Sequence, residues 1–415
     1  MRVLVCSYSD LEGGAARAAQ KHFYALLQMG VDAELWTATK KFNRNGCFYE
    51  SSKFQLAINF IKRRISLTIT QFFFKSNGYK SLNLFSSIDV NQINQSLFDL
   101  VHLHWIGGEC ISIKDVGLIN RPLVWTLHDM WGFMGIEHYE DNNASRWLIN
   151  DSKVDERTFL WDVDLWNWRR KQKFWKKPFQ LVVSSSWMQK KVEHSKLMSS
   201  WDTTLIPNAL DRNFYKPVDV DSFREQLGIP EGKKIIMYGA SGGLSDQRKG
   251  GDYFLEIVDI LCKRFDDIHV IVFGGGNDDS LKKLSSNISY HFLGHIKNDH
   301  ELVALYSLAD LLIVPSREDN LPLLAVEAQI CGCPVIAFNV SGLKDIVIDG
   351  VTGFLVNDFK VAEMARLAIE LLGNKDRLQE FRGRARNHGL SRWSIESVIP
   401  KYIELYNKCL GNKNK

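Results

Sequence analysis

The stretch EDNLPLLAVEAQICGCPVIAF, residues 318–338, predicts a loop, a helix, a tight turn and a strand in close succession. Pro322 suits the first turn of a helix, where its missing N–H is not needed, and Asn320 is expected to cap that helix. Apolar residues then recur at helical spacing. Gly332 favours the left-handed backbone that ends a helix, and Pro334 prevents the helix from continuing. A further apolar run precedes the stretch, so we expect a strand–loop–helix–turn–strand unit.

The same alternation of buried strand, glycine turn and helix recurs along both halves of the chain. We expect strands at 2–8, 31–38, 99–105, 122–130 and 179–186, then at 233–240, 268–276, 309–316 and 334–338, with helices at 15–27 and 251–265. Short apolar strands that alternate with helices form parallel sheets. The fold class is therefore α/β, with two doubly wound Rossmann-like domains whose ligands bind at the carboxyl ends of the strands.

The length of 415 residues suits two or three domains, and 24% charged and 45% hydrophobic residues are ordinary for a soluble globular protein. Residues 203–232 contain three of the nine prolines and are interpreted as the linker. We expect an N-terminal domain at 1–208 and a C-terminal domain at 209–390. A last helix at 391–415 is expected to cross back onto the N-terminal domain.

Charge and cysteine content exclude several function classes. A net charge of +4 is too small to suggest nucleic-acid binding. The seven cysteines are irregularly spaced, and Cys331 and Cys333 have no partner pair at zinc-like spacing, so buried free thiols are expected. No apolar run reaches the roughly 18 residues of a transmembrane helix, and the N-terminus reads as a strand rather than a signal peptide. We expect a cytoplasmic protein.

Asp319 and Glu327 stand on either side of the expected helix start. A helix N-terminus at the carboxyl end of a strand offers free N–H groups to an anion. Two carboxylates beside it could accept hydrogen bonds from two hydroxyl-bearing parts of one phosphorylated ligand. The alternative is ordinary, because acids at the start of a helix also favour its dipole and are common on surfaces. Spacing alone does not decide between the two.

Further segments resemble the motifs of one enzyme family and keep their order. They are EGGAARAA (12–19), WTLHD (125–129), LIPNALDRNFYKP (205–217), RKGGDYFLEIV (248–258), FLGHI (292–296), YSLADLLIVPS (306–316), PSREDNLPLLAVEAQICGCPVIAF (315–338) and DIVIDGVTGFLV (345–356). Together they resemble the retaining family 4 glycosyltransferases of the GT-B fold, of the type that assembles polysaccharides and O-antigen. The resemblance spans nearly the whole chain and implies two domains that face a central cleft.

The resemblance implies a UDP- or GDP-type sugar nucleotide as donor substrate, no cofactor and no metal. Lys249, with Arg248, would neutralise the leaving diphosphate. Asp319 would hold the donor sugar, Glu327 the ribose, and His128 would approach the sugar from the other domain. The implied catalytic residues are Asp319, Glu327, His128 and Lys249, and the implied donor- and phosphate-binding residues are Gly13, Gly14, Arg248, Asn320, Leu321 and Gly294.

Three positions depart from the family pattern. The first acid of the pair is Asp319 instead of glutamate, and Glu318 lies one residue earlier. The arginine that usually precedes the lysine is absent, and Arg248 or Arg17 is expected to supply its charge. Ala209 replaces the usual glycine of the linker.

Two histidines near the end of an expected strand are a weaker candidate site. His102 and His104 alternate in VHLHW, so we expect them on opposite faces of the sheet and unable to share a metal ion. His104 is expected either to face the acceptor substrate or to serve a structural role.

Two basic, aromatic-rich segments suggest a membrane surface. Trp166–Phe179 and Phe54–Ser76 combine Arg and Lys with large apolar side chains, a composition typical of segments that bind anionic lipid. The alternative is a packed helix with a solvated basic face. With a lipid-linked glycan or polysaccharide as the expected acceptor, we expect a peripheral protein on the inner face of the cell membrane.

The function expected from the sequence is retaining transfer of a sugar from a nucleoside diphosphate sugar to that acceptor. Two alternatives share the fold. One is a sugar-nucleotide epimerase, and the other is a catalytically inactive scaffold for polysaccharide assembly.

Overall fold

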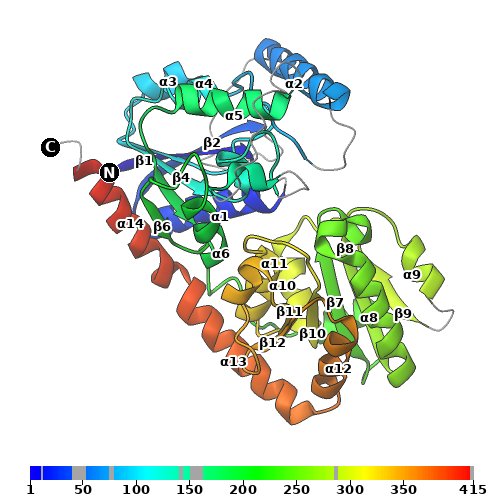
Figure 1. The fold of residues 1–415 in the computed structure, drawn as a ribbon. Coiled ribbons are helices and arrows are strands. Elements are labelled where there is room, and N and C mark those ends of the chain that lie inside the picture. Colours follow the sequence, from blue (N-terminus) through cyan, green and yellow to red (C-terminus); the bar gives the residue numbers. More distant parts are fainter. Residues whose placement is uncertain are drawn as a thin grey trace. The chain divides into compact units, whose positions relative to one another are not determined.

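The computed structural model describes residues 1–10, 13–39, 53–73, 79–139, 144–149, 162–284 and 288–411 (Figure 1). The chain divides into two compact units. Unit 1 consists of Met1–Asn208 and Ile399–Lys415, and unit 2 is Ala209–Val398. Residues 391–398 therefore belong to unit 2, and the return of the chain to unit 1 begins within the last helix rather than at its start.

Unit 1 is built on a parallel six-stranded sheet with the order β2-β1-β3-β4-β5-β6. Its strands are β1 (Arg2–Ser9), β2 (Asp32–Thr39), β3 (Leu100–Leu103), β4 (Leu123–Leu127), β5 (Gln180–Val183) and β6 (Thr203–Leu205). Its helices are α1 (Gly14–Gln28), α2 (Lys53–Phe73), α3 (Val90–Gln95), α4 (Ile113–Val116), α5 (Val163–Phe174), α6 (Ser186–Glu193) and the unit 1 part of α14 (Ile395–Gly411).

Unit 2 has a second parallel six-stranded sheet, with the order β12-β11-β10-β7-β8-β9. Its strands are β7 (Lys234–Ala240), β8 (Ile268–Gly274), β9 (Ser289–Phe292), β10 (Leu311–Val314), β11 (Val335–Phe338) and β12 (Gly353–Val356). Its helices are α7 (Asp221–Gln226), α8 (Gly251–Arg264), α9 (Asp279–Leu284), α10 (Asp299–Leu308), α11 (Leu323–Ile330), α12 (Val361–Leu372) and α13 (Lys375–Trp393).

Three strands, β6, β9 and β12, lie outside the strand ranges expected from the sequence. β6 lies inside the segment interpreted as the linker, and none of its three residues is buried. The four residues of β9 are all half-buried. All three strands close an edge of their sheet, where short strands are tolerated and leave little pattern to detect.

The stretch at 318–338 forms the expected unit, with one correction at the helix start. α11 begins at Leu323 because Pro322 keeps an extended backbone and serves as the N-cap, without a side-chain capping bond. Asn320, expected as the cap, is buried in the preceding loop. The helix ends as predicted: Gly332 has φ +79° and directly follows the C-cap residue. β11 then pairs with β10.

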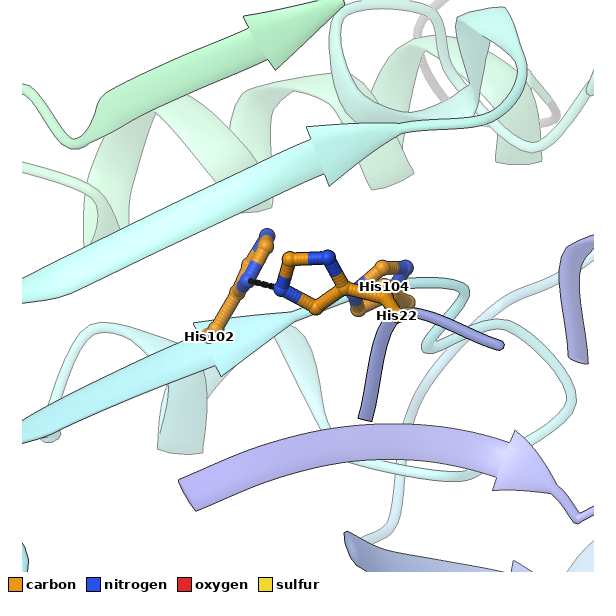
Figure 2. Close-up of side chains that lie close together, drawn as sticks. All are labelled: His22, His102 and His104. Carbon is orange, nitrogen blue, oxygen red and sulfur yellow. Dashed lines mark hydrogen bonds between the residues drawn. The ribbon is translucent and has the colours of Figure 1, made fainter. Parts of the chain in front are cut away.

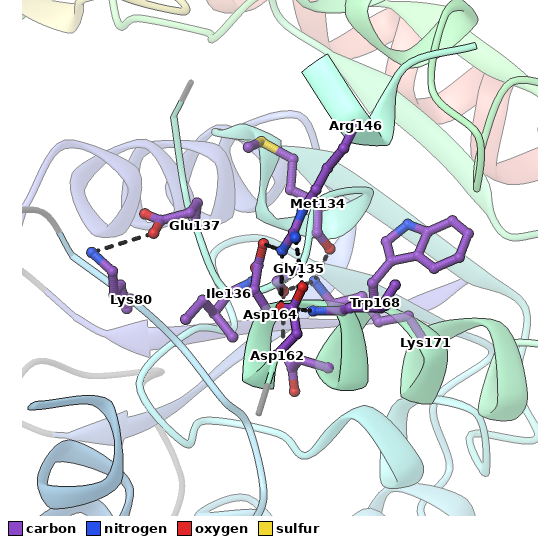
Figure 3. A network of polar contacts seen from close by, with 12 residues as sticks. Lys80, Met134, Gly135, Ile136, Glu137, Arg146, Asp162, Asp164, Trp168 and Lys171 are labelled. Carbon is purple, nitrogen blue, oxygen red and sulfur yellow. Dashed lines mark hydrogen bonds and ion pairs between the residues drawn. The ribbon is translucent and has the colours of Figure 1, made fainter. Parts of the chain in front are cut away.

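The basic aromatic segment 166–179 packs in part into unit 1, as in the alternative of a packed helix with a solvated basic face. Lys171 on α5 is fully buried and donates to the backbone carbonyls of Trp131, Met134 and Gly135 (Figure 3). Arg170 donates to the carbonyls at 82 and 83. Neighbouring basic residues on a helix look alike in a sequence. Here Arg170 and Lys171 donate to carbonyl groups of the neighbouring loops instead of facing solvent.

An ion-pair network fixes the N-terminus of the same helix. Asp162 caps α5 by accepting from the amide of Leu165 at 2.9 Å. Arg146 bonds to both Asp162 and Asp164, and Asp164 also accepts from the Ile136 amide at 2.6 Å (Figure 3). These aspartates therefore have a structural role in holding the loop after β4 against α5.

Replacing Lys171 with methionine tests this role. The change keeps the length of the side chain but leaves buried carbonyl groups without their donor, so we expect the free energy of unfolding to fall by about 3 kcal/mol. The exposed Lys173 on the same helix is the matched control, and Lys173→Met should change stability by less than about 0.5 kcal/mol. Denaturant unfolding measures both. Equal stability of the two variants would contradict the structural role of Lys171.

Candidate functional site

A buried carboxylate in unit 2 is neutralised by two basic side chains. Asp319, 5% exposed, lies in the loop between β10 and α11 and forms an ion pair with Lys249. The Arg248 guanidinium lies 3.8 Å from the other carboxylate oxygen and donates to the Glu318 carbonyl at 2.9 Å. The structure thus brings together three residues that sequence analysis assigned to the site.

The backbone around Lys249 is fixed by glycine and by capping. Gly250 has φ +70°, and a Cβ there would lie 1.9 Å from the carbonyl oxygen of Pro315. Only glycine allows so close an approach. The Asp246 carboxylate accepts from the amides of Arg248 and Lys249 at 3.1 and 3.3 Å. The lysine is therefore held against the end of β10, where Asp319 follows.

Arg317 is a basic residue at this site that sequence analysis did not single out. Its guanidinium pairs with Asp252 at 2.8 Å and lies 4.0 Å from the centre of the Tyr253 ring. Its amide donates to the Arg248 carbonyl at 2.8 Å. The only signal for Arg317 in the sequence was its position directly before Glu318. With Lys249 and Arg248 it makes three cations around the loop that leads into α11.

Glu327, the second expected acid, is buried on α11. The Tyr306 hydroxyl, from α10, donates to one of its carboxylate oxygens at 2.8 Å. Burial, reinforced by the Glu327 charge, raises the pKa of Tyr306 well above its usual value, so the tyrosine stays protonated and donates. Sequence analysis quoted Tyr306 within a motif without assigning it this role. Its hydrogen bond fixes the orientation of the carboxylate.

The glycines expected at the site have open space beside their backbone. Gly294, with φ +62°, follows β9, accepts from the Gly274 amide at 2.7 Å, and would have open space around a Cβ. In unit 1, Gly13 caps α1 with φ +90°, and both it and Gly14 are exposed with open space around them. These exposed amides at the start of a long helix can bind an anion.

His128 follows β4 in unit 1, as expected, and is neutral. Burial lowers its pKa to about 4, although the nearby Asp129 acts in the opposite direction. Its Nε2 lies 2.9 Å from Nδ1 of His104. At neutral pH it can offer a hydrogen bond but no positive charge.

The expected separation of His102 and His104 is wrong. Residues two apart along a strand lie on the same face of the sheet, so His102 in β3 and His104 just after it face the same side. The two ring centres are 4.4 Å apart, and His22 of α1 joins them (Figure 2). The two-residue spacing in VHLHW was therefore the available signal for this cluster.

The comparison with protein families finds a match in the C-terminal half. The model for "Glycosyl transferases group 1" matches residues 219–388, which contain Lys249, Asp319 and Glu327. A D-inositol 3-phosphate glycosyltransferase of Nocardia farcinica is 31% identical over 217 residues, which is 50% of this chain and 47% of that protein. The enzyme of the same name from Arthrobacter sp. is 28% identical over 343 residues, 76% of this chain and 74% of that protein. The chain thus spans about half the length of the first relative.

Solved structures match the whole chain in fold. Sucrose-phosphate synthase from Thermosynechococcus elongatus has a TM-score of 0.65 at 16% identity and covers 99% of both chains. Anabaena HepE in complex with UDP-glucose has a TM-score of 0.64 at 17% identity, with 98% of this chain and all of that chain covered. Two parallel sheets with flanking helices and these neighbours confirm the expected GT-B fold.

The close approach at Gly250 leads to a prediction on stability. Gly250→Ala should destabilise the protein by more than the 1–2 kcal/mol or so of a left-handed alanine, because the new methyl group also meets the Pro315 carbonyl. Gly228 is the matched control, with φ +63° and open space around it. Gly228→Ala should therefore show only the cost of placing alanine in a left-handed backbone conformation. Denaturant unfolding of both variants measures the difference. If Gly250→Ala were no worse than Gly228→Ala, the close contact would be absent in solution.

Proposed function

We propose that this chain, whose residues 219–388 form a domain of the group 1 glycosyl transferases, is a retaining glycosyltransferase that uses a UDP- or GDP-type sugar as donor. The observation that carries the proposal is the cluster of Lys249 and Arg248 on the buried carboxylate of Asp319. A buried acid with two cations, beside a helix N-terminus, offers both charges that a sugar nucleotide needs. Its diphosphate needs cations, and its sugar hydroxyls need an acceptor.

Lys249 and Asp319 are paired with each other in the proposed site. When the donor binds, Lys249 turns to the diphosphate and Asp319 accepts from sugar hydroxyls, so each charge exchanges one partner for another. Cations aimed at phosphate oxygens stabilise the charge that develops as the diphosphate leaves. The amides of Asn320 and Leu321 lie between Asp319 and the helix start, where they support the same sugar.

Glu327 is proposed to bind the ribose of the donor. The hydrogen bond from Tyr306 holds its carboxylate in one orientation before the ligand arrives. A carboxylate that is already oriented loses less entropy when it accepts ribose hydroxyls. Burial of both residues also keeps bulk water from competing for the same oxygen.

Retention follows from attack on the face from which the diphosphate departs. The bond between the anomeric carbon and the diphosphate oxygen breaks as the bond to the acceptor oxygen forms. The departing phosphate oxygen takes the proton of the acceptor hydroxyl, so no side chain is needed as base. Neutral His128 contributes a hydrogen bond to the sugar rather than a charge.

Two acceptor classes are proposed for test. A lipid-linked glycan or polysaccharide follows from the resemblance of the sequence. A phosphorylated inositol follows from the relatives, which are named D-inositol 3-phosphate glycosyltransferase. We favour the glycan, because a surface of unit 1 suits a lipid membrane.

That surface is the outer face of α2. Compared with an ordinary surface helix, α2 has its polar and apolar sides exchanged. Polar residues face the protein: Ser66 donates to Glu109 at 2.7 Å, and Asn59 donates to the Ser87 carbonyl at 3.4 Å. The exposed side carries the large apolar residues Phe54, Leu56, Phe60, Ile61, Ile65, Leu67, Phe72 and Phe73, with Arg64, Thr68 and Gln71 among them. Residues 74–76 of the expected segment lie outside the described part of the chain. So many exposed large side chains on one helix mark an interaction surface.

The expected basic contribution of α2 is smaller than the sequence suggested. Lys62 donates to the Ser86 carbonyl at 3.2 Å, and Arg63 donates to the Ala38 carbonyl at 2.9 Å. Only Arg64 of this basic run is exposed. Insertion of apolar side chains, more than charge, therefore supports the proposed membrane contact. In the described part of the chain no helix is long and apolar enough to span a bilayer.

The proposed donor site is tested with a panel of UDP- and GDP-sugars and both acceptor classes. Glu327→Gln keeps an acceptor for Tyr306 but loses the charge, so the KM for the donor should rise about 10- to 150-fold, equivalent to 1.5–3 kcal/mol or so. Asp319→Asn should lower kcat by a similar factor. Chromatography of nucleoside diphosphate and glycoside measures both.

Glu318→Gln is the matched control, because the bond from Arg248 goes to the backbone carbonyl of that residue, which the substitution keeps. A greater loss of activity in Glu318→Gln than in Asp319→Asn would mean that Glu318, one residue earlier, is the acid of the site. Unchanged kinetics in all three variants would contradict the proposed donor site. Conversion of the donor to an epimer would indicate the epimerase, and binding without turnover of any donor would indicate the scaffold.

The proposed membrane contact is tested by sedimentation with anionic vesicles. Phe60→Ser with Phe72→Ser removes two side chains that are 60% and 80% exposed, and vesicle binding should weaken at least about tenfold. Leu97, 81% exposed elsewhere on unit 1, provides the control Leu97→Ser, which should bind like the wild type. A wild-type protein that stays in solution at low salt, or that pairs with a second copy through α2, would contradict the membrane contact.

A further inference from the structure

Three histidine side chains meet in the interior of unit 1. His22 comes from α1, His102 from β3 and His104 from the residue after that strand (Figure 2). One nitrogen from each ring lies within 4.8 Å of the others, and Nε2 of His22 is 3.2 Å from Nδ1 of His102. All three side chains are buried. None of them is needed for the proposed donor chemistry.

The three rings offer the nitrogen ligands that transition-metal ions prefer. All three side chains are shielded from bulk water, and each contributes one ring nitrogen to the cluster. Imidazole nitrogen is a common ligand of zinc and similar ions.

One of these nitrogens has no partner. Nε2 of His104 is buried and makes no hydrogen bond in the described structure. A buried polar atom without a hydrogen-bond partner is unfavourable, because it has lost its contact with water and gained nothing in return. A bound cation would satisfy this nitrogen.

The surroundings match those of a metal site. The Tyr406 hydroxyl of α14 lies 2.7 Å from both His22 Nε2 and His102 Nδ1. The remaining ring nitrogens of two histidines are held from outside: His102 Nε2 by the Thr126 hydroxyl at 2.8 Å and His104 Nδ1 by His128 at 2.9 Å. Such outer hydrogen bonds orient ligating histidines and fix their tautomers.

We propose that His22, His102 and His104 bind one divalent transition-metal ion, Zn²⁺ in the first place, with the oxygen of Tyr406 as fourth ligand. Zinc–nitrogen bonds of about 2.0–2.1 Å in a tetrahedron place two ligand atoms roughly 3.3 Å apart. The 3.2 Å between Nε2 of His22 and Nδ1 of His102 matches this separation, and one nitrogen of each of the three rings lies within 4.8 Å of the others. Tyr406 gives up its proton to solvent when the ion binds.

The proposed site is structural. Four protein ligands leave no position for substrate or water, which is the mark of a closed site. The ion would join α1, the end of β3 and α14, three segments far apart in the sequence. This inference does not rest on the proposed transferase activity, so either can fail without the other.

The experiment begins with protein purified on a tag free of histidine, without added metal. Mass spectrometry of the metal content should find about one zinc per chain. The protein is then unfolded with a chelator and refolded with Co²⁺, which should give the strong visible absorption of four-coordinate cobalt. Metal-loaded protein should also melt at a higher temperature than protein refolded without metal.

His102→Gln and His104→Gln should each weaken Co²⁺ uptake at least about tenfold. His291→Gln is the matched control, because His291 and His269 form a second histidine pair, 2.8 Å apart, in unit 2. Zinc far below one per chain together with no cobalt band in refolded wild type overturns the proposal. So does a cobalt band that survives in the folded His102 and His104 variants. If those variants do not fold, the zinc content and cobalt spectrum of the wild type decide.

Discussion

The contact between Gly250 and the carbonyl of Pro315 is the constraint on which the site in unit 2 depends. Parallel pairing of β7 with β10 brings the carboxyl ends of both strands to one edge of the sheet. Only a residue without a side chain can then turn at position 250 and pass within reach of that carbonyl. The turn places Lys249 on Asp319. The charge arrangement thus follows from backbone geometry rather than from the attraction between the two side chains.

The sequence predicted what has a regular pattern. The buried strands, the end of α11 at Gly332 and the family resemblance depend on apolar periodicity, on a left-handed glycine and on ordered motifs. The structure confirms the fold, and a family model of group 1 glycosyl transferases matches residues 219–388. Lys249, Arg248 and Asp319 were assigned together from motifs far apart in the chain, and they do meet.

Part of what failed depends on three-dimensional surroundings that no local pattern encodes. Lys171 looks like a surface cation in the sequence, but loop carbonyls surround it. Its acceptor carbonyls lie at least 36 residues away in the sequence. The expected separation of His102 and His104 failed for another reason, because residues two apart along a strand lie on the same face. Which third side chain joins them, His22 of α1, depends on the packing of a distant helix.

Burial determines what the histidines of unit 1 can offer. A histidine with a pKa near 4 carries no charge at neutral pH, so His128 can offer a hydrogen bond but no positive charge. The cations assigned to the proposed donor site, Lys249 and Arg248, lie beside Asp319 in unit 2. His128 and His104 share a single proton across their 2.9 Å contact. A metal ion on Nε2 of His104 would force that proton onto Nδ1 of His104, make Nε2 of His128 the acceptor and leave Nδ1 of His128 as the donor. The buried histidines would then determine which hydrogen bond His128 can offer to a sugar.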